Sequence, residues 1–265
     1  MEKRKEIIAV LRESQVGDKV TVMGWVRAFR SNRFIALNDG STAKTLQIVV
    51  DYEKFDEELL SKLYYHTSIG VTGTIVESQG SEQSIELLAE SLEIFGEVDP
   101  ELYPIQPARQ TMDFLRQKAH FRMRTNVFGA VFRIRHATAY AIHKYFNDRG
   151  YYYMMTPIIT GSDAEGAGEM FRVTTLPPEA APTTDKGDID WSQDFFGSPT
   201  NLTVSGQLQA ETGALALGKV YTFGPTFRAE NSNTSRHLAE FWMIEPEIAF
   251  ADLQDDMDLA EDFLK

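Results

Sequence analysis

The feature that most constrains the fold of this chain is a series of five short segments with β-strand character in its first 96 residues. Each combines partial alternation of apolar and polar residues with many β-branched or aromatic side chains. The segments are residues 20–30, 33–41, 44–52, 68–78 and 84–96. Between the third and the fourth, residues 53–66 have the apolar spacing of a helix. The sequence therefore predicts three strands, a helix and two further strands.

This order of elements is typical of the OB-fold, a small β-barrel that often binds oligonucleotides on its open face. We assign residues 1–100 to such a barrel. Residues 98–107 contain three prolines, which disfavour both helices and central strands. We therefore expect a linker over residues 101–120 and a second domain over residues 121–265.

The second domain shows a different pattern, in which helices and strands are mixed. Residues 121–149 have helical spacing and end at Gly150, a common helix stop, and residues 151–159 are typical of a strand. Residues 202–218 predict the end of a strand that runs into a helix. Residues 220–230 and 241–250 predict two long strands joined by a hairpin loop. Pro, Thr and Asp are frequent in residues 174–200, which we interpret as a surface insertion, and residues 251–265 predict an acidic helix.

Charge and composition narrow the classes of function. The formal net charge of −13 argues against nucleic acid, because phosphate binding relies on Lys and Arg. Residues 102–136, however, carry seven Lys or Arg residues and a single acid, Asp113. This stripe is either a nucleic-acid contact or a solvated face. The chain has no cysteine, no apolar run long enough to span a bilayer and no signal pattern, so we expect a cytoplasmic protein without a membrane contact.

The most informative stretch for chemistry is the predicted hairpin at residues 226–250. We expect Arg228 and Glu230 on one face of a strand, Arg236 and His237 in the hairpin loop, and Phe241 at the start of the return strand. An arginine offers a donor fork for a phosphate, and an aromatic ring offers a stacking face for a base. The alternative is a surface hairpin with ordinary cross-strand ion pairs.

With its loop and return strand, this stretch resembles the second signature motif of the class II aminoacyl-tRNA synthetases, which are built on an antiparallel sheet. The resemblance implies that Arg228 is the catalytic residue, holding the α-phosphate of ATP and the carboxylate of the amino acid. It also implies that Glu230 contacts the adenine side or the tRNA end. Arg236 and His237 would approach the γ-phosphate, and Phe241 would stack on adenine. The fold class implied for the whole chain is α+β.

The helix and strand around residues 143–160 resemble the first motif of the same family. Pro157 takes the place of the proline that lies near the dimer interface of these enzymes, so the resemblance implies a homodimer. Taken alone, a proline after a strand is an ordinary edge device.

The arrangement of an OB-fold before the catalytic domain resembles that of the subgroup that attaches aspartate, asparagine or lysine to tRNA. The residues of the motifs resemble those of the asparaginyl enzymes. By family position, Glu165 would bind the substrate α-ammonium group and Gln207 would line the same pocket. Aspartyl enzymes carry a lysine where this chain has Ala210. A lysine there pairs with a substrate carboxylate, so its absence favours an amide substrate.

The barrel carries three residues that match anticodon-binding positions of the related aspartyl enzymes. They are Phe34, Gln47 and Glu86. The resemblance implies that Phe34 stacks on a base, while Gln47 and Glu86 read base edges. Half-buried sheet packing is the alternative for Phe34.

The implied reaction is the ATP-dependent attachment of asparagine to tRNA(Asn) through asparaginyl-adenylate. The third motif of the family does not occur in this sequence, and the acidic residues that usually hold Mg²⁺ lie in that part of the enzymes. We therefore interpret the chain as the amino-terminal portion of a longer protein and expect it to be inactive alone, with no metal ligands of its own. The alternatives are an aspartyl enzyme that charges tRNA(Asn) and a fragment that binds tRNA without catalysis. An amide-forming paralogue of the catalytic fold is disfavoured by the barrel.

Overall fold

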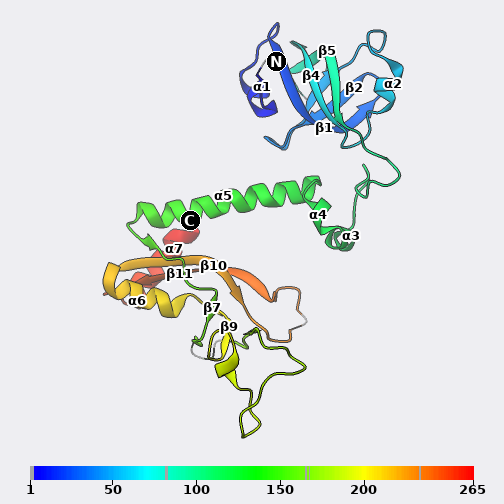
Figure 1. The fold of residues 1–265 in the computed structure, drawn as a ribbon. Coiled ribbons are helices and arrows are strands. Elements are labelled where there is room, and N and C mark those ends of the chain that lie inside the picture. Colours follow the sequence, from blue (N-terminus) through cyan, green and yellow to red (C-terminus); the bar gives the residue numbers. More distant parts are fainter. Residues whose placement is uncertain (1–2, 81–82, 165, 167, 233) are drawn as a thin grey trace. The chain divides into compact units, whose positions relative to one another are not determined.

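The computed structural model describes residues 3–80, 83–164, 166, 168–232 and 234–265. The chain forms two compact units, residues 1–136 and residues 137–265. The ribbon in Figure 1 shows the elements of each unit.

The first unit contains a closed barrel of five strands. Strand β1 pairs with β2 and β4, β2 pairs with β3, and β5 joins β3 to β4. The elements are α1 (Ile7–Glu13), β1 (Lys19–Arg30), β2 (Phe34–Asn38), β3 (Leu46–Val49), α2 (Glu57–Ser61), β4 (Ser68–Glu77) and β5 (Ile85–Gly96). The predicted order of three strands, a helix and two strands is confirmed, with α2 shorter than residues 53–66.

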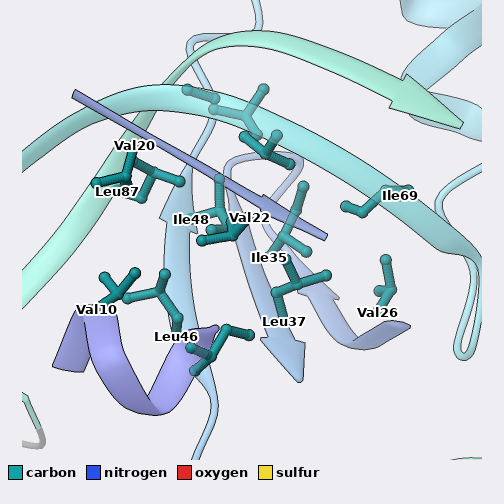
Figure 2. Packing of buried hydrophobic residues seen from close by; sticks show 14 of the residues in the cluster. Val10, Val20, Val22, Val26, Ile35, Leu37, Leu46, Ile48, Ile69 and Leu87 are labelled. Atoms are coloured by element: carbon teal, nitrogen blue, oxygen red, sulfur yellow. The ribbon is translucent and has the colours of Figure 1, made fainter. Parts of the chain in front are cut away.

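Side chains that point into the barrel form its apolar core (Figure 2). Ile35 pairs with Ile48 and Leu37 pairs with Leu46 across β2 and β3, and all four are fully buried. Helix α1 adds Val10 to the same cluster. Because side chains alternate along a strand, burial of these residues turns their sequence neighbours outward.

A glycine sets the close approach of β4 and β5. A Cβ atom at Gly73 would lie 2.0 Å from the carbonyl oxygen of Leu88, and the register shifts between Thr72 and Gly73. No larger residue fits beside that backbone without a displacement.

Two short helices and one long helix follow the barrel. They are α3 (Met112–Gln117), α4 (Ala119–Arg122) and α5 (Asn126–Asp148). The predicted continuous helix over residues 121–149 is wrong at its start, because Thr125 interrupts it. The Thr125 hydroxyl donates to the carbonyl of Arg122 and accepts from the amide of Phe128, so it ends one helix and caps the next.

The second unit contains two small sheets and two further helices. Its main sheet pairs β10 (Lys219–Phe227) with β11 (Glu240–Ile248) as an antiparallel hairpin, and β6 (Tyr152–Tyr153) joins β10 in parallel. The remaining elements are β7 (Ile159–Thr160), β8 (Arg172–Val173), the 3₁₀ helix η1 (Trp191–Gln193), β9 (Thr200–Leu202), α6 (Gln207–Leu217) and α7 (Leu253–Leu264). The expected α+β class is confirmed.

The strand expected over residues 151–159 is divided between the two sheets. Strand β6 pairs with β10, whereas β7 pairs with β9. Pro157 lies between them and lacks the N–H that a continuous ladder would need. The prediction of one strand here is therefore wrong.

Helices cover both faces of the β10–β11 hairpin (Figure 1). On one face, Tyr221 of β10 stacks on Phe146 of α5, with ring centroids 4.5 Å apart, and Phe263 of α7 packs beside them. On the other face, Val220 packs against Ala210 and Ala214 of α6, together with the partly buried Met154. This α6 face is the one on which Arg228 and Phe241 lie by alternation along the hairpin.

Candidate functional site

Arg228 directly follows the last residue of β10, and its backbone bonds lie beyond the paired strands. Its backbone N–H donates to the carbonyl of Ala239 over 3.1 Å, but the N–H of Ala229 turns away and donates to Glu169 over 2.7 Å. The ladder therefore ends at Phe227, and the prediction that Arg228 and Glu230 lie within a strand is wrong.

The side chain of Arg228 combines a buried donor with an aromatic neighbour. Its guanidinium carbon lies 5.5 Å from the ring centroid of Phe241, the second residue of β11. Its Nε atom is buried and has no hydrogen-bond partner among the described residues. A buried donor without a partner is rare, and it is the arrangement expected of a group that awaits an anionic ligand.

A glycine allows a second segment to approach this arginine. A Cβ atom at Gly168 would lie 2.7 Å from Oε1 of Glu230 and 3.3 Å from Cδ of Arg228. The segment therefore rests directly on both side chains. Glu165, the residue expected to bind the α-ammonium group, lies outside the described residues.

The hairpin loop places Arg236 and His237 on the surface. Both are exposed, and the imidazole Nδ1 of His237 is hydrogen-bonded to the hydroxyl of Thr234. Their expected position in the loop is confirmed. Among the described residues, no hydrogen bond, ion pair or ring contact joins either side chain to Arg228.

Gln207 begins α6 beside the same hairpin. Its backbone N–H donates to Ser205 Oγ, and its side-chain amide donates to Glu211 over 2.9 Å. The backbone N–H of Phe227 donates to the carbonyl of Thr203 over 2.8 Å, so the segment before Gln207 runs along the end of β10. The structure thus brings the start of α6 and the Arg228 region to one side of the sheet.

Glu245 joins these elements, and sequence reasoning missed it. Its carboxylate accepts hydrogen bonds from the hydroxyl of Ser205, from the backbone N–H of Gly206 at 3.1 Å and from the hydroxyl of Thr222 at 2.7 Å. Glu245 lies four residues after Phe241 on β11, so the two side chains point to the same face of the sheet. Alternation along the strand could therefore have indicated Glu245. Gly168 was also missed, and its only signal was its place three residues after Glu165.

Ala210 is fully buried in the apolar cluster between α6 and β10. Its methyl group packs against Val220 rather than lining an open pocket. Packing therefore also disfavours a lysine at this position, because its ammonium group would enter an apolar cluster.

The three barrel residues lie on the same face of adjacent strands. Phe34 of β2 and Gln47 of β3 are half-buried and alternate with buried core residues, whereas Glu86 of β5 is itself buried, with 6% of it exposed. Gln47 donates its side-chain amide to Oε1 of Glu86 over 2.8 Å, and Ser78 Oγ donates to the same oxygen over 2.6 Å. Arg33 lies over the ring of Phe34 at 5.6 Å.

Pro157, expected near a dimer interface, is exposed in this chain. Met155 and Ile158 beside it are exposed by 86% and 42%. These residues form an apolar surface on the second unit.

The described residues contain no group of three or more His, Asp or Glu side chains arranged to hold a metal ion. Among them, no helix is both long enough and apolar enough to cross a bilayer.

Comparison with known families agrees with this arrangement. Residues 20–95 match the model of the OB-fold nucleic acid binding domain. Residues 111–265, more than half of the chain, match the model of the class II tRNA synthetases (D, K and N). The chain belongs to the class II tRNA synthetases.

Among curated relatives of this synthetase chain, the asparagine–tRNA ligase of Porphyromonas gingivalis is 56% identical over 266 residues, which are 99% of the chain and 57% of the relative. That of Nostoc is 54% identical over 265 residues, or 98% of the chain and 57% of the relative. The chain thus spans slightly more than half the length of these relatives.

A solved structure gives the same result for the fold. The asparaginyl-tRNA synthetase of Pyrococcus horikoshii, complexed with asparaginyl-adenylate, superimposes with a TM-score of 0.81 at 25% identity. The match covers 100% of the chain and 57% of that protein.

Proposed function

We propose that this chain provides the tRNA-binding barrel and the activation site of an enzyme that attaches asparagine to tRNA(Asn). The observation that carries the proposal is Arg228, whose buried Nε has no hydrogen-bond partner in the described part of the chain and whose guanidinium lies over Phe241. The relatives named asparagine–tRNA ligase, at 56% identity, support asparagine as the amino acid.

In the first proposed step, the carboxylate of asparagine attacks the α-phosphate of ATP and gives asparaginyl-adenylate and pyrophosphate. Arg228 stabilises the negative charge that develops on the phosphate, and Phe241 supplies the stacking face for adenine. Glu230 contacts the adenine side or the tRNA end, while Arg236 and His237 close over the distal phosphates from the loop. No covalent enzyme intermediate is needed, because positioning and charge stabilisation account for the chemistry.

The amino-acid side of the site is proposed to involve Gln207 and Glu165 with Arg228. Gln207 begins α6, which Glu245 ties to the sheet through Ser205 and Gly206. When bound, Mg²⁺ would relieve charge on the phosphates; among the described residues, no group of three or more His, Asp or Glu side chains is arranged to hold it.

In the second step, the terminal ribose hydroxyl of tRNA(Asn) attacks the activated carbonyl and AMP leaves. We propose that the outer face formed by Phe34, Gln47 and Glu86 selects the GUU anticodon. The hydrogen bond between Gln47 and Glu86 presents the two side chains as a unit. We also propose that the exposed surface around Pro157 joins two copies in a homodimer, and that the enzyme works in the cytoplasm.

Binding of a non-hydrolysable asparaginyl-adenylate analogue, followed by calorimetry, tests the activation site directly. Wild-type chain should bind it, and Arg228→Ala should lose at least about 10-fold in affinity, because a charge-assisted contact is worth about 1.5–3 kcal/mol. Arg172→Ala is a matched control, because Arg172 packs over Trp191 in the insertion. Equal affinity of wild type and Arg228→Ala would remove the central support for the site.

Pyrophosphate exchange, measured in parallel with asparagine and with aspartate, distinguishes the proposed function from an aspartyl enzyme and from a non-catalytic fragment. Exchange that depends on asparagine supports the proposal, whereas preference for aspartate favours an aspartyl enzyme. Binding of the analogue and of tRNA(Asn) without exchange favours a fragment that binds but does not catalyse.

A further inference from the structure

A large cleft lies within the first unit, between the barrel and residues 105–133. Its volume is about 1040 Å³. The barrel contributes Trp25, Arg27 and His66 to its wall, and the segment after the barrel contributes Arg109 and Arg124. All of its lining residues belong to residues 1–136.

The cleft carries uncompensated positive charge. Arg27, Arg109, Arg124 and Arg133 line it, and none of its described lining residues is acidic. Arg27 donates to the carbonyl of Arg124 over 2.8 Å, and Arg133 donates to that of Gly40 over 2.7 Å. Neutral acceptors of this kind hold the guanidinium groups in place but leave their charge unbalanced.

His66 is a buried polar residue whose ring borders this cleft. Only 5% of it is exposed, and its Nε2 has no hydrogen-bond partner among the described residues. Its ring packs at 4.2 Å from Tyr65 and 5.3 Å from Tyr103, between centroids. Burial chiefly, and then Arg27 and Arg124, lower its pKa to about 4, so the imidazole is neutral at pH 7.

The backbone of His66 is also unusual. Its φ is 71°, in the left-handed region that non-glycine residues seldom adopt, and its N–H donates to the carbonyl of Val26 over 2.7 Å. An uncommon backbone conformation together with an unsatisfied buried nitrogen is frequent at ligand sites.

We propose that this cleft binds the phosphodiester backbone of the tRNA, at a place separate from the outer face that carries Phe34. The inference rests on the proposed tRNA-binding function. The four arginines contact phosphates, Trp25, which is 46% exposed, offers its ring to a sugar or base, and Nε2 of His66 hydrogen-bonds a ribose hydroxyl or phosphate oxygen. A chain of phosphates accounts for guanidinium groups spread along the cleft better than one small anion does.

The salt dependence of tRNA binding tests this assignment. Affinity for tRNA(Asn) is measured by fluorescence titration over a range of salt concentrations, for wild type and for Arg109→Ala. The Arg109 side chain is exposed and makes no hydrogen bond or ion pair with the described residues, so its removal should leave the fold intact. Loss of one phosphate contact should reduce the slope of log K against log salt by about 0.7–0.9. Arg12→Ala, an exposed arginine at the end of α1, is the matched control and should keep the wild-type slope.

His66→Phe examines the buried nitrogen and keeps an aromatic ring. Since the imidazole is neutral, this variant should bind tRNA about 2- to 12-fold more weakly, as expected for one lost hydrogen bond, at an unchanged salt slope. A melting temperature equal to that of wild type shows that the variant is folded. If it binds as wild type does, Nε2 contacts no ligand and this part of the assignment is overturned.

A second RNA distinguishes the cleft from the anticodon site. With tRNA whose anticodon is scrambled, Arg109→Ala should show the same reduction in slope, while Phe34→Ala should lose its effect. An Arg109→Ala slope equal to that of Arg12→Ala on both RNAs overturns the proposal even if Phe34→Ala still weakens binding to tRNA(Asn). Inorganic phosphate that shifts the His66 ring signals while tRNA does not would assign the cleft to a small anion and would also overturn it.

Discussion

Replacement of Glu245 tests whether one carboxylate holds the start of α6 against the hairpin. In Glu245→Ala, the donors on Ser205, Gly206 and Thr222 lose their acceptor. The backbone N–H of Gly206 cannot turn to another partner, whereas the two hydroxyls can rotate. An unsatisfied buried donor costs about 1–3 kcal/mol, so we expect a loss of about 1–3 kcal/mol in the free energy of local opening.

The isosteric variant Glu245→Gln should be much milder. Its amide oxygen can still accept from Gly206 and Thr222, and the hydroxyl of Ser205 can rotate to accept from the new amide. A neutral acceptor replaces a charged one, so we expect a loss of about 1 kcal/mol.

Amide hydrogen exchange at residues 206–210 measures this opening separately from the barrel, with a tenfold change in protection for each ~1.4 kcal/mol. Glu240→Ala removes an exposed carboxylate from the same strand and is the control. Unchanged protection in Glu245→Ala would refute the reasoning. Equal losses in the Ala and Gln variants would show that charge, and not the number of acceptors, holds the helix.

Three further outcomes follow from packing and protonation. Gly73→Ala should prevent the barrel from closing, because its Cβ would lie 2.0 Å from a backbone oxygen of β5, and loss of the barrel's cooperative thermal transition checks this. Ala210→Lys should lower the melting temperature markedly before any change of substrate preference, since overpacking alone costs about 1–3 kcal/mol; an unchanged melting temperature would show that the lysine escapes the cluster. Asp194 accepts from the amide and hydroxyl of Thr175, which hold its pKa at about 2. Because this folded-state pKa lies below the ordinary value of 3.8, its stabilisation is present above about pH 4 and is lost as the pH falls toward 2. Exchange protection of the Thr175 amide should therefore decline over that window in wild type, and should already be low at pH 7 in Asp194→Ala, which removes the acceptor.

Local patterns were sufficient to predict the barrel and the hairpin. Alternation in residues 33–41 and 44–52 is imposed by a core on one side and solvent on the other, so Ile35 and Ile48 could be assigned inward from the pattern alone. The hairpin loop was predicted in the same way, from two strands with a polar segment between them. These features depend on neighbours in sequence.

Element ends were less predictable where a single hydrogen bond decided them. The periodicity of residues 121–149 is continuous, but Thr125 can cap a helix or lie inside one, and only its bonds to Arg122 and Phe128 show which occurs. Similarly, the strand at residues 151–159 has the composition of one element, and its division depends on two different partners, β10 and β9.

The sites themselves were decided by contacts between distant segments. The motif indicated Arg228, but the burial of its Nε and the approach of Gly168 arise only when residues 60 positions apart meet. The basic stripe at residues 102–136 was ambiguous as a sequence, because a run of arginines has the same composition whether solvent or a cleft surrounds it. Folding of the first unit places Arg109, Arg124, Arg27 and His66 around one cleft, where the buried imidazole Nε2 has no hydrogen-bond partner among the described residues. Desolvation and proximity are properties of the packed chain, so tertiary structure alone could turn the stripe into a candidate binding site.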